Sequence, residues 1–283
     1  MSDNQKTLNS SIEFAGVGLH TGEDVHMVIE PARINHGVKF QRIDLDNQPI
    51  LPADINLVTD TQRSTTLEKD NVKIVTVEHL MSALYALGVN NVLIKMDSSE
   101  VPILDGSAKC FVEEIQKVGL NTQDAPLKYI YLPNPIHYTD PDSGSEILFV
   151  PANNFIISVV LDYENLALRT QYAEIRDLKD YSTEIAPCKT FVFLTELEKL
   201  AKANLIKGGG LENAIVVVDR EDTKNSEIKK LAHLLGKDDS DIKINGNVLN
   251  NCEMQFYNEP ARHKLLDVIG DLALIGMPIK GHI

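Results

Sequence analysis

Hydrophobic and polar residues alternate along the first part of the chain. Apolar side chains recur at every second position in residues 25–29 and 37–40, and a glycine-rich turn at residues 16–18 precedes them. A period of two places apolar side chains on one face of a β-strand. The N-terminal region is therefore predicted to form a sheet.

The spacing then changes to that of a helix. Leu80, Leu84 and Leu87 lie on one face of a predicted helix over residues 75–87, and Gly88 is placed to end it. A strand and a second helix are predicted next, at residues 91–96 and 108–118.

Periodicity lapses at residues 121–126, where polar side chains end in a proline. Such a segment is typical of a short linker. We therefore expect one domain over residues 1–124 and a second over residues 125–283. Strands followed by a helix recur in the second half, at residues 128–132, 145–150, 155–161 and 261–275. This order predicts an α+β protein.

One segment, at about residues 194–218, reads as an insert in the second half. Residues 194–207 have helical spacing, three glycines follow at 208–210, and residues 214–218 form a β-branched run. A glycine run can cradle phosphate, but the Lys-Ser/Thr pair of a P-loop does not follow it. A helix-to-strand turn is the better interpretation.

Composition limits the classes of partner. With 283 residues, 43% of them hydrophobic, the chain is long enough for two modest domains. Its formal charge of −14 disfavours nucleic acid and anionic membranes, so a phosphate-bearing ligand must meet positive charge locally. No 18-residue apolar window suggests stable membrane insertion, and residues 1–6 lack the features of a signal peptide, so we expect a cytoplasmic protein.

The three cysteines, Cys110, Cys188 and Cys252, are far apart and odd in number. They suggest neither a disulfide framework nor a thiolate zinc site. We interpret them as packing thiols, although Cys188 beside Lys189 leaves nucleophilic chemistry as a disfavoured alternative.

A histidine and two carboxylates recur on one face of the last predicted helix. His263, Asp267 and Asp271 stand at i, i+4 and i+8, and Pro260 suits the first turn. Apolar residues occupy much of the remaining surface, so this polar stripe is costly unless positive charge meets it. A divalent cation would do so. A solvated face, or a histidine paired with its neighbour, explains the same spacing.

Glu78 and His79 form a second candidate pair. A metal-bound water has a pKa near 7, and an adjacent carboxylate can accept its proton. A lone Glu-His pair is common by chance. It gains weight beside His263 and Asp267, because together they form a three-ligand site with one open position and a base.

A third candidate lies at residues 189–193, where Thr190 is followed by Phe191 and Phe193. The pattern also fits an ordinary strand with inward phenylalanines. A threonine hydroxyl that faces a metal would stabilise an oxyanion.

These motifs occur in an order that resembles the family of zinc-dependent UDP-3-O-acyl-N-acetylglucosamine deacetylases. The resemblance covers nearly the whole chain and is far more specific than either short metal motif. It is carried by six ordered blocks, at residues 16–22, 76–80, 101–108, 189–191, 208–217 and 262–272.

The resemblance implies two domains of similar topology, each a small sheet layered with helices, packed helix layer to helix layer with zinc between them. It implies that His79, His263 and Asp267 bind Zn²⁺. Glu78 is then the general base that directs water at the N-acetyl carbonyl of UDP-3-O-(hydroxyacyl)-N-acetylglucosamine, and Thr190 hydrogen-bonds the oxyanion.

The resemblance also implies substrate contacts. Lys264 matches a lysine that contacts substrate, and Phe191 and Phe193 match residues near the sugar and the acyl chain. The insert matches a segment that forms a hydrophobic passage for the acyl chain. Our candidates for its lining are Leu197, Ile206, Leu211 and Ala214.

One family feature has no match. A later Gly-His supplies the general acid that Asp271 partners, whereas His282 aligns within the preceding strand. We expect the 283-residue chain to bind zinc and turn over poorly, since losing a general acid costs about 10² to 10⁴ in rate. A version extended through the Gly-His tests this. We also expect that a hydroxyacyl-carrier-protein dehydratase could be fused beyond this chain.

Two alternatives stay open. The same three ligands would serve another zinc amidase or a peptidase, which would cleave peptides rather than the acylated sugar nucleotide. A zinc-containing binding module without turnover is the second alternative. Metal analysis and acetate release separate these readings.

Overall fold

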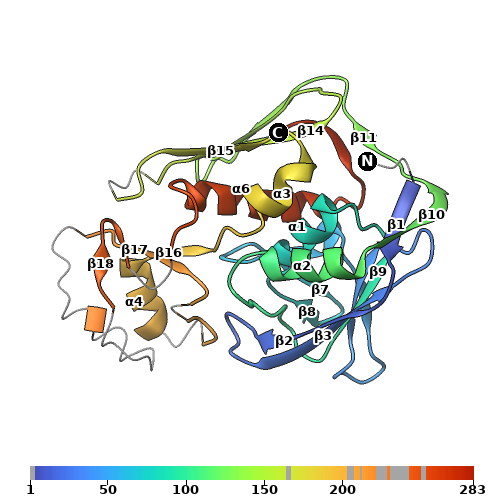
Figure 1. Ribbon diagram of the computed structural model, residues 1–283, viewed down its shortest axis with the longest axis horizontal. Coiled ribbons are helices and arrows are strands. Elements are labelled where there is room, and N and C mark those ends of the chain that lie inside the picture. The colour runs from blue at the N-terminus through green and yellow to red at the C-terminus, as the bar shows by residue number, and fades with distance from the viewer. Residues whose placement is uncertain are drawn as a thin grey trace.

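The protein is an α+β structure of several small sheets and a few helices (Figure 1). The computed structural model describes residues 4–163, 167–202, 207–210, 212–220, 228–229, 242–249 and 253–283. Among the helices of these residues, none has both the length and the apolar character needed to cross a membrane.

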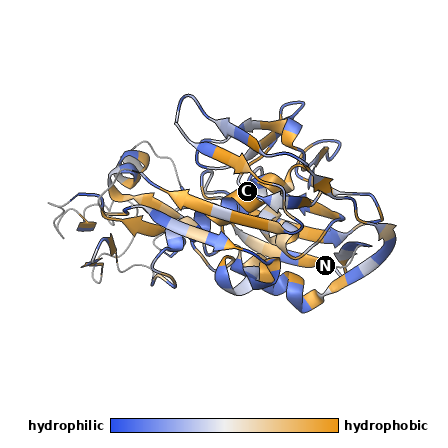
Figure 2. Cartoon of the chain, turned by 90° about the horizontal axis from the view of Figure 1, so that it is seen from above, coloured by the Kyte–Doolittle hydropathy of each residue, from blue (hydrophilic) through white to orange (hydrophobic). Residues whose placement is uncertain are grey.

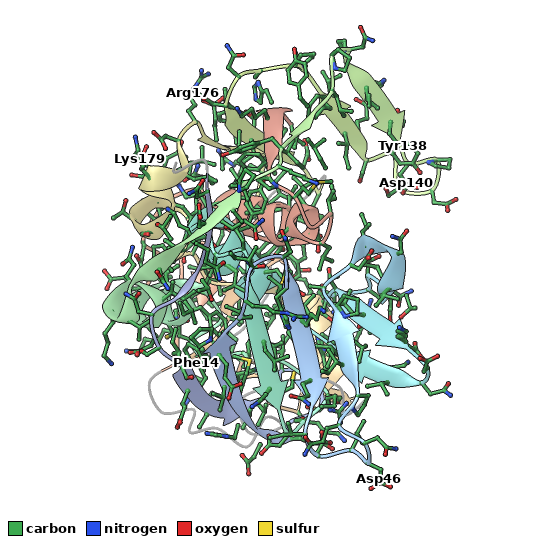
Figure 3. The ribbon with its side chains drawn as sticks, turned by 90° about the vertical axis from the view of Figure 1, so that its right-hand side faces the viewer. Phe14, Asp46, Tyr138, Asp140, Arg176 and Lys179 are labelled. Carbon is green, nitrogen blue, oxygen red and sulfur yellow. The ribbon has the colours of Figure 1, made fainter. Side chains whose placement is uncertain are left out.

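The alternating N-terminal residues form a five-stranded sheet, as their spacing predicts. In spatial order its strands are β2 (Ile12–Val17), β3 (Asp24–Pro31), β9 (Val92–Met96), β4 (Val38–Arg42) and β5 (Ile50–Pro52). Helices α1 (Glu78–Ala86) and α2 (Lys109–Val118) lie on one side of it. Phe14 of β2, marked in Figure 3, packs edge-on against Phe111 of α2 with ring centroids 5.1 Å apart.

A strand replaces the linker that we expected at residues 121–126. This segment is β10 (Leu120–Pro126), which pairs antiparallel with β1 (Asn4–Leu8). The linker prediction was wrong, and the division of the chain into domains near residue 124 stays a prediction. A three-stranded sheet follows a short 3-10 helix, η1 (Ile55–Leu57), and consists of β6 (Val58–Asp60), β7 (Thr66–Lys69) and β8 (Val72–Ile74).

The second half contains a four-stranded sheet with a long helix on its inner face. The sheet has the order β11 (Ile130–Tyr131), β20 (Ile279–His282), β14 (Phe155–Leu161) and β15 (Gln171–Ile175), and the helix is α6 (Glu259–Ala273). Many residues of the strands are hydrophobic (Figure 2). Val160 and Tyr172, which pair across β14 and β15, are more than half exposed. The short helices η2 (Leu178–Asp180) and α3 (Tyr181–Glu184) follow β15.

A hairpin projects beyond this sheet. It consists of β12 (Ile136–Thr139) and β13 (Glu146–Phe149), and Figure 3 shows Tyr138 and Asp140 at its outer end. The side chains of Ile136, Tyr138 and Ile147 are all more than half exposed.

The insert has a small core of its own. Helix α4 (Leu194–Lys202) and strand β17 (Ile215–Val217) confirm the predicted helix and strand. Strand β16 (Phe191–Phe193) pairs parallel with β17, and β19 (Val248–Leu249) and β18 (Ile244–Asn245) complete the sheet. Leu194, Leu197, Val216 and Leu249 are buried together between these elements.

Helices α1 and α6 pack against each other between the two larger sheets, as the resemblance implies (Figure 1). Eight of the nine residues of α1 are buried, including Glu78 and His79. The helices approach so closely that a Cβ added to Gly270 would lie 2.0 Å from the backbone oxygen of Glu78. Glycine at this position therefore lets α6 reach the first turn of α1.

Candidate metal centre and substrate pocket

The helix crossing brings together two histidines and a carboxylate. His263 and Asp267 lie one turn apart on α6, and His79 lies in the first turn of α1. The Nε2 atoms of His263 and His79 lie 3.4 Å and 3.7 Å from Asp267 Oδ1. One potential ligand atom from each residue lies within 4.8 Å of the other two. The three predicted ligands therefore converge.

The protonation of this group suits a cation. The carbonyl of Cys188 can only accept from His263 Nδ1, 3.0 Å away, so Nε2 is the ring nitrogen left to face a metal. Burial, followed by the charge of His263, lowers the pKa of His79 to about 4. Burial opposes ionisation of Asp267, but His263, Lys264 and His79 outweigh it and lower its pKa. A neutral imidazole, as at His79, and an ionised carboxylate, as at Asp267, are the forms that bind metals.

An unsatisfied oxygen provides an independent test of this fit. Asp267 Oδ2 accepts a hydrogen bond from Lys264 Nζ at 2.9 Å, whereas the buried Oδ1 has no hydrogen-bond partner within the described residues. Buried polar atoms are nearly always paired, so each exception calls for an explanation. A divalent cation held by Asp267, His79 and His263 would satisfy this oxygen.

Glu78 lies beside these ligands in a setting that favours its protonated form. Burial, together with the charge of Asp267, raises its pKa to about 8. The backbone N–H of Thr65 donates to its Oε2 at 3.0 Å, and the Thr65 hydroxyl donates to Asp271 Oδ1 at 2.6 Å. Loss of hydration raises the pKa of Asp271 to about 6, and the hydrogen bond from Thr65 opposes this rise. The residue as a whole remains exposed to solvent. Thr65 thus links both carboxylates.

A pocket of about 720 Å³ contains these groups and most of the predicted substrate contacts. Its walls include Glu78, Thr190, Asp271, Lys264, Phe191, Phe193, Leu197 and Ala214. Ile206 and Leu211, also predicted for the passage, lie outside the residues that the structure describes. The backbone N–H of Thr190 donates to Gly106 O at 2.8 Å, which fixes the start of β16 at the pocket.

One wall of the pocket is aromatic. Phe191 and Phe193 project from the same side of β16, and Tyr163 packs edge-on against both, with centroid distances of 6.0 Å and 5.3 Å. Leu197 of α4 and Ala214 extend the apolar surface. This wall suits an apolar part of a ligand, next to the polar metal centre.

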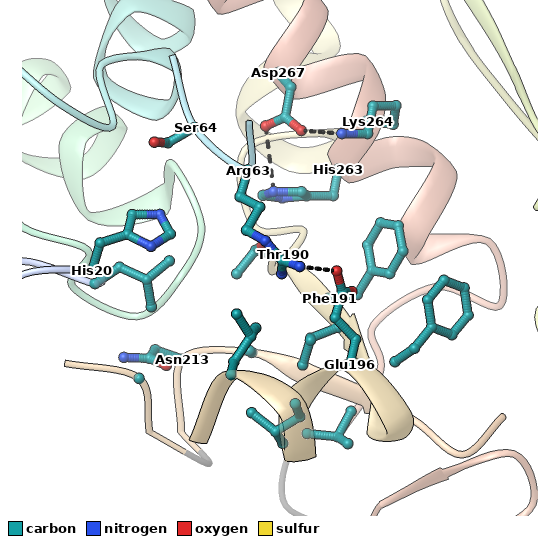
Figure 4. Close-up of a pocket in the computed structure, with 18 of the residues that line it drawn as sticks. His20, Arg63, Ser64, Thr190, Phe191, Glu196, Asn213, His263, Lys264 and Asp267 are labelled. Atoms are coloured by element: carbon teal, nitrogen blue, oxygen red, sulfur yellow. Dashed lines mark hydrogen bonds and ion pairs between the residues drawn. The ribbon is translucent and has the colours of Figure 1, made fainter. Parts of the chain in front are cut away.

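Several pocket residues were not assigned a role from the sequence. His20, Arg63 and Asn213 line the cavity, and Figure 4 shows His20 across it from Phe191. Arg63 Nη2 lies 2.5 Å from Glu196 Oε1 of α4, so this ion pair joins the segment before β7 to the insert. Of these three, only His20 had a signal in the sequence, because it lies between glycines in the block at residues 16–22 that carries the family resemblance.

His282 lies in strand β20, which confirms its predicted placement within a strand. Its Nε2 lies 2.8 Å from Ser158 Oγ, and it is not among the residues that line the pocket. Its ring therefore serves the second sheet rather than the metal centre.

Together these features define a class: an α+β protein with a candidate metal centre at a helix crossing and a deep, partly aromatic pocket. The family model for UDP-3-O-acyl N-acetylglycosamine deacetylase matches residues 5–233 and 233–283. The chain belongs to this family.

Relatives with two kinds of name support this assignment. The bifunctional enzyme LpxC/FabZ of Bacteroides thetaiotaomicron is 46% identical over 279 residues, which cover 99% of this chain and 60% of that protein. The protein of the same name from Chlorobaculum tepidum is 41% identical, with the same coverage. The UDP-3-O-acyl-N-acetylglucosamine deacetylase of Myxococcus xanthus is 37% identical and is covered to 81%. The chain thus spans about 60% of the length of the bifunctional relatives.

Proposed function

We propose that this protein hydrolyses the N-acetyl group of UDP-3-O-(hydroxyacyl)-N-acetylglucosamine, releases acetate, and depends on Zn²⁺, in the committed step of lipid A synthesis. The observation that carries the proposal is the unpartnered, buried Oδ1 of Asp267, which lies within 4 Å of two imidazole nitrogens. The family name and the printed name of the Myxococcus xanthus relative support the substrate.

His79, His263 and Asp267 would hold the metal. When bound there, Zn²⁺ would acidify water and polarise the amide carbonyl. Glu78, adjacent to His79 in sequence, would accept the proton of the attacking water in its ionised form, which a cation bound beside it would favour. The Thr190 hydroxyl would donate to the developing oxyanion. The acyl carbon gains the oxygen of water, the C–N bond breaks, and the leaving nitrogen takes up a proton.

Lys264 and the aromatic wall would orient the substrate. The carboxylate of Asp267 raises the pKa of Lys264, so its ammonium stays charged and offers the local positive charge that a diphosphate requires. Phe191 and Phe193 would contact the sugar and the start of the acyl chain, and Leu197 and Ala214 would continue the passage.

Two further parts of the proposal concern the setting of the enzyme. We propose that it acts in the cytoplasm, where the sequence leads us to expect it. The bifunctional names of two relatives support the expectation that a second enzyme accompanies the deacetylase, and we assign a hydroxyacyl-carrier-protein dehydratase to it.

Metal content and acetate release test the proposal together. We expect one zinc per chain in the wild type and none in His79→Ala. Glu78→Gln should keep its zinc while acetate release from the acylated sugar nucleotide falls by about 10² to 10⁴, the usual contribution of a general base.

Different results in these two assays would favour one of the alternative functions. Parallel loss of zinc and activity in Glu78→Gln would reject its role as base. Cleavage of peptides but not of the sugar nucleotide would favour another zinc amidase, and stoichiometric zinc without any acetate release would favour a binding module. Glu113→Gln, on the exposed face of α2, is the control.

A further inference from the structure

A carboxylate outside the metal centre is fully buried and has no cationic partner within the described residues. Glu100 has 0% of its surface exposed. Its oxygens accept hydrogen bonds from the backbone N–H groups of His20 and Thr21 and from the hydroxyls of Thr21 and Thr76, at 2.8–3.1 Å. A buried charge without a counter-ion is costly unless hydrogen bonds replace its hydration. Four donors from two separate segments replace it here.

The turn at residues 18–22 is built around this carboxylate. A Cβ on Gly18 would lie 2.4 Å from Glu100 Oε2 and 2.3 Å from Thr21 Oγ1, so only glycine leaves room for the carboxylate. Gly22 closes the turn by donating from its backbone N–H to Gly18 O at 2.9 Å, and its φ is +67°. Gly18 thus leaves space for the Glu100 carboxylate, and Gly22 closes the turn that binds it.

The second segment that Glu100 binds leads directly into the metal centre. Thr76 lies two residues before Glu78 and has a φ of +59°, which is strained for a β-branched residue. Its hydroxyl donates to Glu100 Oε1 at 2.8 Å, and Val75 forms a parallel bridge with Glu100. One carboxylate therefore connects the turn at residues 18–22 to the segment that precedes α1.

The turn carries a ring that faces the pocket. His20 lines the cavity, and its buried Nε2 has no hydrogen-bond partner within the described residues. On the other side of the turn, the Gly208 N–H donates to Leu19 O at 3.1 Å. Because Glu100 holds the backbone N–H of His20, it sets where this ring enters the pocket.

We propose that Glu100 is a positioning residue of this site: it holds the turn at residues 18–22 so that the His20 imidazole presents its free nitrogen to a polar group of the bound substrate. The inference rests on the proposed function for the identity of that substrate. Glutamine at position 100 has nearly the same shape, but it would place an NH₂ group where a carboxylate oxygen now accepts a hydrogen bond. Two donors would then face each other, so the turn would shift.

A double-mutant cycle tests this route of action. His20→Ala and Glu100→Gln are each expected to lower kcat/KM by about 10- to 100-fold, with zinc content unchanged. If Glu100 acts through His20, adding Glu100→Gln to His20→Ala should lower kcat/KM by no more than about 3-fold further. Glu100→Asp, which keeps the charge but shortens the side chain, should fall between the wild type and Glu100→Gln.

Binding provides a readout that does not depend on turnover. Calorimetric titration with UDP-3-O-(3-hydroxyacyl)-N-acetylglucosamine, in a Glu78→Gln background that spares the ligand, should show the same non-additive losses of affinity. Glu23→Gln is the matched control, because this exposed glutamate flanks the same turn. It should leave affinity and activity as in the wild type.

Other results overturn the inference. Losses that multiply in the double variant, or a Glu100→Gln protein that loses zinc in parallel with activity, would show a general structural role. Should Glu100→Gln fail to fold, Thr21→Val removes one hydroxyl donor to Glu100, together with the acceptor of the Glu23 N–H. Wild-type binding by that variant would overturn the inference. Normal zinc and binding without acetate release in the wild type would instead count against the proposed function.

Discussion

Glu78 is a buried acid whose proton affinity changes greatly on folding. Its pKa rises from 4.5 to about 8 because it is buried and lies near Asp267. The folded, metal-free protein therefore keeps a proton that the unfolded chain releases above pH 4.5. Stability is then lost as pH rises towards 8, by about 1.4 kcal/mol per pH unit from this group at most.

Glu78→Gln should remove this loss. In zinc-free protein with chelator present, the variant should match the wild type near pH 4.5 and become progressively more stable than it up to about pH 8, with a plateau above. Thermal unfolding at several pH values measures the difference. A stability difference that stays constant with pH would contradict the raised pKa.

At the scale of residues, sequence spacing predicted the part of the site that is local. His263 and Asp267 are one helical turn apart, and Glu78 and His79 are adjacent, so their proximity follows from the helix itself. Contacts between residues that are far apart in the sequence could not be predicted from spacing. The Thr65 hydroxyl meets Asp271 across 206 positions, and His20 reaches the pocket on a turn whose partner is 80 positions away.

At the scale of elements, the crossing of α1 and α6 depends on Gly270. Alanine there would gain about 1 kcal/mol of helix propensity, but its Cβ would meet the Glu78 backbone oxygen at 2.0 Å. The backbone of α1 cannot move away without disturbing the helix. The overpacking cost of about 1–3 kcal/mol should therefore exceed the gain in helix propensity. We expect Gly270→Ala to lower the thermal midpoint and to weaken zinc binding.

Zinc titration and calorimetry measure both effects of Gly270→Ala. Glu113→Ala, which also places alanine in a helix but on an exposed face of α2, should change neither. An unaltered zinc affinity in Gly270→Ala would show that the helix spacing does not set the ligand geometry.

A second contact between elements joins Arg63 to Glu196 of α4 at the pocket wall. Both side chains are about 40% exposed, so the pair is worth no more than about 1 kcal/mol. Arg63→Ala and Glu196→Ala should each raise KM for the acylated substrate by up to about 5-fold, since 1.4 kcal/mol corresponds to tenfold. The double variant should match the singles, and 0.5 M salt should reduce the effect. Fully additive changes would show that the pair does not couple.

Elements with clear periodicity were predicted well, and an edge strand was not. Residues 155–161 and 261–275 each bury one face, so their apolar residues recur at the spacing of a strand and of a helix. The structure has β14 and α6 at these positions. In β10, by contrast, only one of seven residues is buried, because its pairing with β1 relies on backbone hydrogen bonds. Its polar side chains therefore resembled a linker.

At the scale of the whole molecule, the metal centre links two halves of the chain. His79 lies on α1, beside the first sheet, and His263 and Asp267 lie on α6, beside the second sheet, so neither half contains the complete donor set. The family resemblance implied two such layers, and the repeated order of strands and helix agreed with it. It could not predict how closely the helices would pack, because that depends on side-chain volume at the crossing.

A metal that joins both halves should stabilise the fold as a whole. A ligand that binds only the folded state adds about 4 kcal/mol at a free concentration 1,000 times its Kd. Chelation should therefore lower the thermal midpoint by several degrees, and stoichiometric Zn²⁺ should restore it. His263→Ala and Asp267→Ala should abolish the zinc-dependent shift, because each removes one of the converging donors. Cys110→Ala, half-buried on α2, should retain it. If zinc raised the midpoint of the His263→Ala protein as much as that of the wild type, the metal would bind elsewhere.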